Sequence, residues 1–253
     1  MEELTVQSGR KDLKILNRDV IKYIAMFTML LNHIAAVFLE RGTVLHEILE
    51  DVGYFTAITM CYFLVEGYGY TRSKKKYGRR LLLFAIISQF PFMFAFKDAF
   101  SVVGLNMIYT LFICFLILVA MEKIQNGILR TIVLILLVFM TVISDWQILA
   151  AVFTIMFASY KDSKKKMMMA YGIAFLMFAG LNSLNYVAMN TCSVGMALLH
   201  GALSGAAILV SGIVILFFYN GKRSEHGRKF SQWFFYLFYP AHLLVIGLVH
   251  YFM

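Results

Sequence analysis

The run Lys22-Tyr-Ile-Ala-Met-Phe-Thr-Met-Leu-Leu-Asn32-His33 decides how this chain folds. It lies in an apolar segment, from about residue 20 to 39, that is long enough to cross the roughly 30 Å hydrocarbon core of a bilayer as one helix. Ionisable groups inside such a segment cost free energy and usually serve function. The segment therefore predicts a membrane protein, and His33 is its first candidate functional residue.

The composition places the whole chain in the same class. Of 253 residues, 61% are hydrophobic, only 15% are charged and just two are proline, which is not the composition of a soluble domain of this length. We predict an all-α fold, a polytopic bundle of transmembrane helices. Cys61, Cys114 and Cys192 lack the paired spacing of metal ligands, so we interpret them as packing residues.

A hydropathy window of about 19 residues predicts nine spans. They cover residues 20–39, 53–70, 80–96, 105–121, 128–144, 146–160, 168–184, 195–219 and 231–252. Several are shorter than the roughly 20 residues that a perpendicular helix needs to cross a bilayer. The chain then divides into a cytoplasmic N-terminal segment, 1–19, and a single transmembrane domain, 20–253.

The distribution of positive charge predicts the orientation. With nine spans and a cytoplasmic N-terminus, 21 of the 23 Lys and Arg fall on the inner side, and only Arg41 and Lys97 fall outside. The inner basic residues are Arg10, Lys11, Lys14, Arg18, Lys22, Arg72, Lys74, Lys75, Lys76, Arg79, Arg80, Lys123, Arg130, Lys161, Lys164, Lys165, Lys166, Lys222, Arg223, Arg228 and Lys229. This bias predicts a cytoplasmic N-terminus and an extracytoplasmic C-terminus. The net charge of +9 thus needs no nucleic-acid partner to explain it.

The basic segment Thr71–Arg80 has two interpretations. It is a topology signal that also contacts anionic lipids. It is also dense enough in cations to hold the phosphates of a nucleotide-like donor that arrives from the cytoplasm. The sequence leaves both interpretations open.

Further polar residues lie within or beside the predicted spans: Glu66, Asn106, Asp145, His200 and His242. Each of them alone is equally consistent with a hydrogen bond to a neighbouring helix. His33 is distinguished because it follows Lys22 by eleven residues, which places both on one helix face about 16 Å apart.

The chemistry of a buried imidazole narrows the candidate activities. A neutral imidazole in an apolar pocket can take a proton from a hydroxyl or an amine, or can carry an acyl group itself. A donor held by its phosphates at the inner rim, near Lys22, would need to be long and narrow to reach His33. Coenzyme A thioesters have that shape.

Six runs of sequence together resemble the TraX family, and the resemblance extends from about Lys22 to the C-terminus. The runs are Ile21–Ile34, Phe63–Thr71, Tyr77–Leu81, Ile87–Pro91, Asn106–Leu111 and Phe235–Leu243. The named member of the family is linked to N-terminal acetylation of conjugative pilin. The first helix is also similar to the arginine-then-histidine pattern of the acyltransferase-3 family, whose members use cytoplasmic acyl-CoA on extracytoplasmic acceptors.

The resemblance has two departures. TraX-like chains commonly carry an acidic residue just before this histidine, where Asn32 stands here, so Glu66 becomes the candidate partner if His33 must be stabilised as a cation. Lys22 replaces the acyltransferase-3 arginine, which keeps the charge but loses the bidentate fork.

From residues and resemblance together we predict an acetyl-CoA-dependent acyltransferase of the bacterial cytoplasmic membrane that requires no metal. His33, Glu66 and Asn32 are its candidate catalytic residues. The candidate donor-binding residues are Lys22, Arg72, Arg79 and Arg80, and those on the acceptor side are His242, Asn106 and Asp145. Its expected partners are the acyl-CoA donor, membrane lipids and an acceptor glycan, lipid or peptide.

Two other function classes stay open at this stage. A proton-coupled transporter would use His33, Glu66 and His242 as a relay, although the halves of the chain show no convincing repeat. A metal-dependent intramembrane hydrolase would use His33, His242 and a carboxylate as ligands, although no paired His-Glu or His-x-x-x-His spacing favours it.

Overall fold

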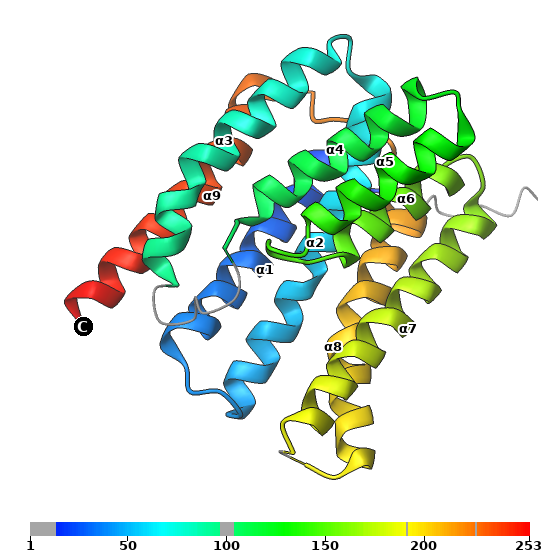
Figure 1. Cartoon of the computed structure of the whole chain (residues 1–253). Coiled ribbons are helices and arrows are strands. Elements are labelled where there is room, and N and C mark those ends of the chain that lie inside the picture. Colours follow the sequence, from blue (N-terminus) through cyan, green and yellow to red (C-terminus); the bar gives the residue numbers. More distant parts are fainter. Residues whose placement is uncertain (1–13, 97–103, 191, 226) are drawn as a thin grey trace, which may run out of the picture.

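A computed structural model describes residues 14–96, 104–190, 192–225 and 227–253. Over these residues the protein is a bundle of nine α-helices (Figure 1), which confirms the all-α prediction. The helices are α1 Arg18–Phe38, α2 Val44–Tyr70, α3 Lys74–Ala95, α4 Met107–Lys123, α5 Gly127–Met140, α6 Leu149–Tyr160, α7 Lys164–Ala188, α8 Val194–Ile213 with a π-helical extension Val214–Phe218, and α9 Arg228–Phe252.

Six of these helices are long and apolar enough to cross a membrane. They are α1, α2, α3, α7, α8 with its extension, and α9. The helices α4, α5 and α6 have 17, 14 and 12 residues, or roughly 26, 21 and 18 Å at 1.5 Å per residue. At 17 residues α4 is at the lower limit for a transmembrane helix, whereas α5 and α6 are too short for a full crossing. Six of the described helices are therefore candidate spans, and the predicted count of nine is not confirmed.

The second span begins earlier than predicted. We expected it at residue 53, but α2 begins at Val44, where the Thr43 hydroxyl accepts a hydrogen bond from the His46 N–H. The hydropathy window misses these first turns because Glu47, Glu50 and Asp51 lower the local mean. As a result, these three carboxylates lie on a membrane-length helix and not in a loop.

Helices α4 and α6 start inside the bundle. The Leu105 N–H donates to the Ile143 carbonyl, and the Asp145 N–H donates to the Leu105 carbonyl, so the connections before α4 and before α6 pair with each other. Asn106 caps α4 by accepting from two backbone N–H groups, and its side chain donates to the Ala85 carbonyl of α3. Helices α4 and α6 pack against α2 and against each other, and α5 packs against α4 (Figure 1).

The N-terminus of α1 is tied to the connection between α8 and α9. The Arg18 N–H donates to the Lys222 carbonyl at 2.9 Å, and the Asp19 carboxylate accepts from the Ser224 N–H at 2.9 Å. Helix α1 begins at Arg18, two residues before the predicted domain boundary. This connection therefore brings its own basic residue, Arg223, next to α1.

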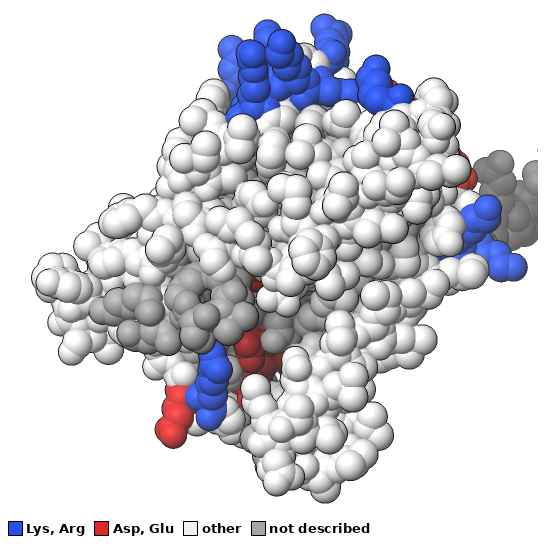
Figure 2. All heavy atoms as spheres, viewed as in Figure 1, with Lys and Arg blue, Asp and Glu red and all other residues white. Residues whose placement is uncertain are grey.

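The described Lys and Arg residues are distributed unevenly over the molecule. Figure 2 shows most of those in view at one end of the bundle, where Figure 1 places the α2–α3 and α4–α5 connections. Lys74, at the start of α3, forms a salt bridge with Glu122, near the end of α4. Arg41 lies in the α1–α2 connection at the opposite end, and Lys97 lies outside the described residues.

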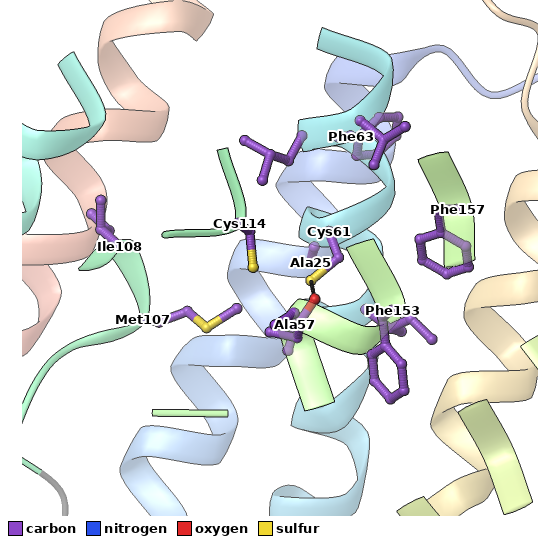
Figure 3. Close-up of a cluster of buried hydrophobic side chains, with 14 of the residues drawn as sticks. Ala25, Ala57, Cys61, Phe63, Met107, Ile108, Cys114, Phe153 and Phe157 are labelled. Atoms are coloured by element: carbon purple, nitrogen blue, oxygen red, sulfur yellow. Dashed lines mark hydrogen bonds between the residues drawn. The ribbon is translucent and has the colours of Figure 1, made fainter. Parts of the chain in front are cut away.

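The core lies where α1, α2, α4 and α6 meet (Figure 3). Cys61 and Cys114 are fully buried there, and the Cys61 thiol donates to the Ala150 carbonyl at 3.7 Å. The packing role predicted for these two cysteines is confirmed. Cys192 differs, because it is only partly buried in the connection before α8.

Gly201 lets α7 and α8 approach closely, and its replacement gives a first prediction. A Cβ there would lie 2.1 Å from the Ser183 Oγ and 2.4 Å from the Ala179 carbonyl oxygen of α7. We expect Gly201→Leu to destabilise the protein by about 1–3 kcal/mol, as overpacking does. The measurement is the Tm in detergent. Gly180→Leu is the control, because Gly180 faces open space; equal losses of Tm in both variants would contradict this account.

Candidate active site

One cavity of about 820 Å³ follows α1 along most of its length. Arg18 and Lys22 line it near one end of the helix, and Asn32, His33 and Ala36 line it toward the other. Its volume falls in the range of about 300–1,000 Å³ typical of small-molecule sites. The face that Lys22 and His33 were predicted to share is therefore the wall of a single cavity.

His33 is paired with His242 of α9. The His33 Nδ1 lies 2.8 Å from the His242 Nε2, and the two rings are within 6° of parallel. The His242 Nδ1 lies 2.7 Å from the Phe238 carbonyl oxygen. Both imidazoles are buried, with 7% of each residue exposed.

These contacts fix the tautomers of a neutral pair. A carbonyl oxygen only accepts, so the His242 Nδ1 carries the proton and its Nε2 accepts from the His33 Nδ1–H. The His33 Nε2 then keeps its lone pair. Since His33 lines the cavity, this nitrogen is available as a base or a nucleophile there.

Aromatic rings surround the histidine pair. Phe96, at the end of α3, meets the His33 ring edge-on with the centroids 5.3 Å apart, and Tyr239 of α9 lies 6.4 Å away. The Tyr239 hydroxyl accepts from the Met107 N–H at the start of α4, at 3.2 Å. The early start of α4 inside the bundle thus helps to close the site from water.

The other end of the cavity is strongly basic. Its lining cations come from α1, α3 and the connections beside them: Arg18, Lys22, Arg72, Arg80 and Arg223. The Lys22 ammonium lies 4.9 Å from the centroid of the Phe235 ring. The Arg80 guanidinium packs 5.8 Å from the Tyr77 ring, and its Nε has no hydrogen-bond partner among the described residues. This cluster has unused capacity to bind an anion.

Arg79 does not belong to this basic cluster. It is exposed and does not line the cavity, whereas Arg80, the next residue of α3, does. Consecutive helical residues point about 100° apart, so only one of the two can face the cavity. Of the predicted donor-binding residues, Lys22, Arg72 and Arg80 line the cavity and Arg79 does not.

The predicted pairing of Glu66 with His33 is wrong. The Glu66 carboxylate lies 3.6 Å from the Arg18 guanidinium and accepts a hydrogen bond from the Tyr219 hydroxyl at 2.8 Å. Arg18 precedes His33 by fifteen residues of the same helix, or about 22 Å. Glu66 therefore holds Arg18 at the basic end. The side chain that pairs with His33 is His242 of α9.

Two amides have structural roles that the sequence did not indicate. The Asn32 side chain donates to the Glu50 carbonyl at 2.9 Å and packs on Gly53, so it joins α1 to α2 while also lining the cavity. Asn106 is fully buried, bonds Ala85 and Gln89, and does not line the cavity. The expectation that Asn106 shapes the acceptor side is therefore wrong, whereas Asp145 does line the cavity.

Sequence analysis missed Arg18 and Arg223 as cavity residues. Both were counted only as topology signals. Arg18 is 6% exposed, and its Nη2 donates to the Phe63 carbonyl at 3.4 Å. Its place one residue after the helix-capping Asn17 was the available signal, while nothing local marked Arg223.

Fold and cavity together define a polytopic helical membrane protein with a polar cavity between its helices. The chain belongs to the TraX family, whose profile, described as TraX protein, matches residues 17–250. It is 31% identical over 234 residues to the "Probable fimbrial assembly protein FimC, serogroup H1" of Dichelobacter nodosus, covering 89% of this chain and 92% of that protein. No solved structure matches the chain.

Proposed function

We propose that this protein is an integral-membrane acyltransferase that moves an acyl group, acetyl by preference, from acyl-CoA to a hydroxyl or amine. The observation that carries the proposal is the single cavity that joins a basic cluster to an imidazole with a free nitrogen. The acceptor would be a glycan, a lipid or a peptide. The relative's name, a fimbrial assembly protein, is consistent with a peptide acceptor.

The basic cluster supports binding of the donor. Phosphates prefer arginine, whose fork can bind two oxygens at once. Arg80 and Arg223 line the cavity from different elements, and Lys22 of α1 adds a point charge to the same cavity. With the phosphates held there, the pantetheine arm would extend along α1 and bring the thioester to His33.

The histidine pair supports the chemical step. The His33 Nε2 takes the proton as the acceptor's oxygen or nitrogen attacks the thioester carbonyl, and the new C–O or C–N bond forms. The C–S bond then breaks, and the thiolate of coenzyme A receives the proton from His33. His242 acts as a positioning residue, because its Nε2 holds the His33 Nδ1–H and stabilises the imidazolium. The same free nitrogen would also serve as the nucleophile of an acyl-histidine route.

The proposed orientation places the basic end in the cytoplasm. The basic connections lie together at one end of the bundle (Figure 2), as the positive-inside rule expects of a cytoplasmic face. Cytoplasmic acyl-CoA would then enter at the basic end. The C-terminus would lie outside, because α4 returns the chain to the basic end between the candidate spans α3 and α7. In a bacterium this corresponds to the inner membrane.

The geometry favours transfer over the alternatives considered from the sequence. Hydrogen bonds lead from His33 to His242 and end at the Phe238 carbonyl, which cannot pass a proton on. Glu66, the third member of the relay, lies on α2 beside Arg18, which is about 22 Å from His33 along α1. Among the described residues, no carboxylate joins His33 and His242 in a group with metal-ligand spacing.

Calorimetric titration of the detergent-purified protein with acetyl-CoA tests the proposal. We expect one binding site per chain with a micromolar Kd, and His33→Gln should bind acetyl-CoA as tightly as the wild type because His33 is assigned to chemistry. Absence of binding at millimolar acetyl-CoA would overturn the acyl-CoA proposal.

A further inference from the structure

At the end of α2 remote from the basic cluster, one histidine and two carboxylates lie close together: His46, Glu47 and Glu50. His46 Nδ1 lies 3.8 Å from the Glu47 Oε1 and 3.7 Å from the Glu50 Oε2. One ligand atom from each of the three residues lies within 4.8 Å of the other two. Figure 2 shows acidic side chains in a hollow at this end of the molecule.

The imidazole of His46 points into this group and is otherwise unsatisfied. His46 is 3% exposed, and its Nδ1 has no hydrogen-bond partner. Buried ring nitrogens are normally paired, so this one has an unfilled interaction. The Glu47 and Glu50 oxygens nearest the His46 Nδ1, at 3.8 and 3.7 Å, are too far away for a hydrogen bond.

The spacing fits a metal ion placed between the three atoms. Bonds of about 2.0–2.2 Å to a tetrahedral Zn²⁺ set neighbouring ligand atoms roughly 3.3–3.5 Å apart. The separations of 3.7 and 3.8 Å are within a few tenths of an ångström of that value. The two carboxylate oxygens lie within 4.8 Å of each other, so the glutamate side chains would move toward each other to complete the coordination.

A neighbouring residue already holds the Glu47 carboxylate in place. The Tyr186 hydroxyl donates to the Glu47 Oε2, which leaves Oε1, the oxygen nearest His46, for the metal. The backbone carbonyl of Glu50 accepts from the Asn32 side chain. The Tyr186 hydrogen bond to the second oxygen of Glu47 is the kind of support that metal ligands receive from neighbouring residues.

Charge supports the same conclusion. Glu47, Glu50 and Asp51 lie within about one turn of α2, and none forms a salt bridge to a Lys or Arg among the described residues. The Asp51 Oδ1 instead accepts from the Ser204 hydroxyl at 2.6 Å. A divalent cation would neutralise the repulsion between the partly buried carboxylates.

We propose that His46, Glu47 and Glu50 bind one divalent transition-metal ion, Zn²⁺ by preference. One imidazole and two carboxylates suit Zn²⁺ better than Mg²⁺ or Ca²⁺, which favour oxygen ligands alone. Glu50 and His33 both line the cavity, so a metal held by Glu50 would lie beside the space that His33 lines. A metal there would bind an oxygen atom of a molecule that occupies this end of the cavity. The site does not depend on the proposed acyl transfer.

The test is metal binding by the full chain in detergent. The protein is stripped with a chelator and titrated calorimetrically with ZnCl₂, MnCl₂, MgCl₂ or CaCl₂. We expect one Zn²⁺ per chain, with an affinity at least tenfold lower in both His46→Gln and Glu50→Gln. The matched control is Asp51→Asn, which removes a neighbouring carboxylate outside the group and should bind Zn²⁺ as the wild type does.

Two results would overturn the proposal. One is the absence of stoichiometric Zn²⁺ binding by the wild type. The other is Zn²⁺ binding of equal affinity in the two ligand variants and the wild type. If His46→Gln does not elute as a folded, monodisperse protein, the Zn²⁺ affinity of Glu50→Gln tests the proposal instead. Gln has nearly the same shape as Glu, so this substitution leaves the packing unchanged.

Discussion

Replacing His33 with Gln is expected to lower the rate of acyl transfer by roughly 10²–10⁴-fold, the usual contribution of a general base. The amide of Gln cannot accept the acceptor's proton, although it keeps a polar group on the cavity wall. The measurement is the initial rate at which label from [¹⁴C]acetyl-CoA enters membranes that contain the protein.

The matched control for this prediction is His200→Gln. His200 stacks on Tyr186 with the ring centroids 4.8 Å apart and does not line the cavity. It should transfer label at the wild-type rate. An unchanged rate in His33→Gln, with the protein present and folded, would exclude His33 as the base or the acyl carrier.

Replacing Arg80 with Ala should weaken acetyl-CoA binding by about ten- to a hundredfold. A charge-assisted hydrogen bond contributes roughly 1.5–3 kcal/mol, and each 1.4 kcal/mol is a factor of about ten in Kd. Arg80 suits this test better than Arg18, because the structure already engages Arg18 with Glu66 and the Phe63 carbonyl. The measurement is the calorimetric Kd at fixed ionic strength.

Arg79→Ala is the control, since it removes the same charge from the adjacent position of α3 on the exposed side. Its Kd should stay close to that of the wild type. Equal weakening in both variants would mean that the basic segment acts only through its overall charge, as a surface that attracts anions. The cavity-facing direction of Arg80 would then have no role in binding.

The sequence predicts best what a single helix determines. Lys22 and His33 share a face because the helical period of 3.6 residues places them there, and the cavity confirms that shared face. The all-α class follows from hydropathy alone. Both features depend only on residues that are near one another in the chain.

Contacts between helices that are distant in the sequence could not be predicted from local sequence patterns. His33 and His242 are 209 residues apart, and their pairing depends on how α1 and α9 pack. Glu66 was an equally reasonable partner for His33 by residue type, but α2 runs antiparallel to α1 and places Glu66 beside Arg18 instead. Residue chemistry identified the candidates, and only packing could choose between them.

The short helices explain why six candidate spans are found among the described helices where nine were predicted. A hydropathy window measures apolar content, and α5 and α6 are as apolar as longer helices. It cannot detect that Asn106 and the Leu105–Asp145 pairing start α4 and α6 inside the bundle. From the sequence alone, a buried asparagine is equally consistent with a functional amide and with a helix cap. Asn106 is a helix cap.

The most direct test of the central claim, that one cavity holds the donor's phosphates and presents its acyl group to His33, is photoaffinity labelling. The probe is an acyl-CoA with a diazirine in its acyl chain, and labelled peptides are mapped by mass spectrometry. We predict labelling of the α1 peptide around His33 and of the end of α3 near Phe96, abolished by excess coenzyme A. Labelling confined to the lipid-facing helix α5, or unaffected by coenzyme A, would contradict the account.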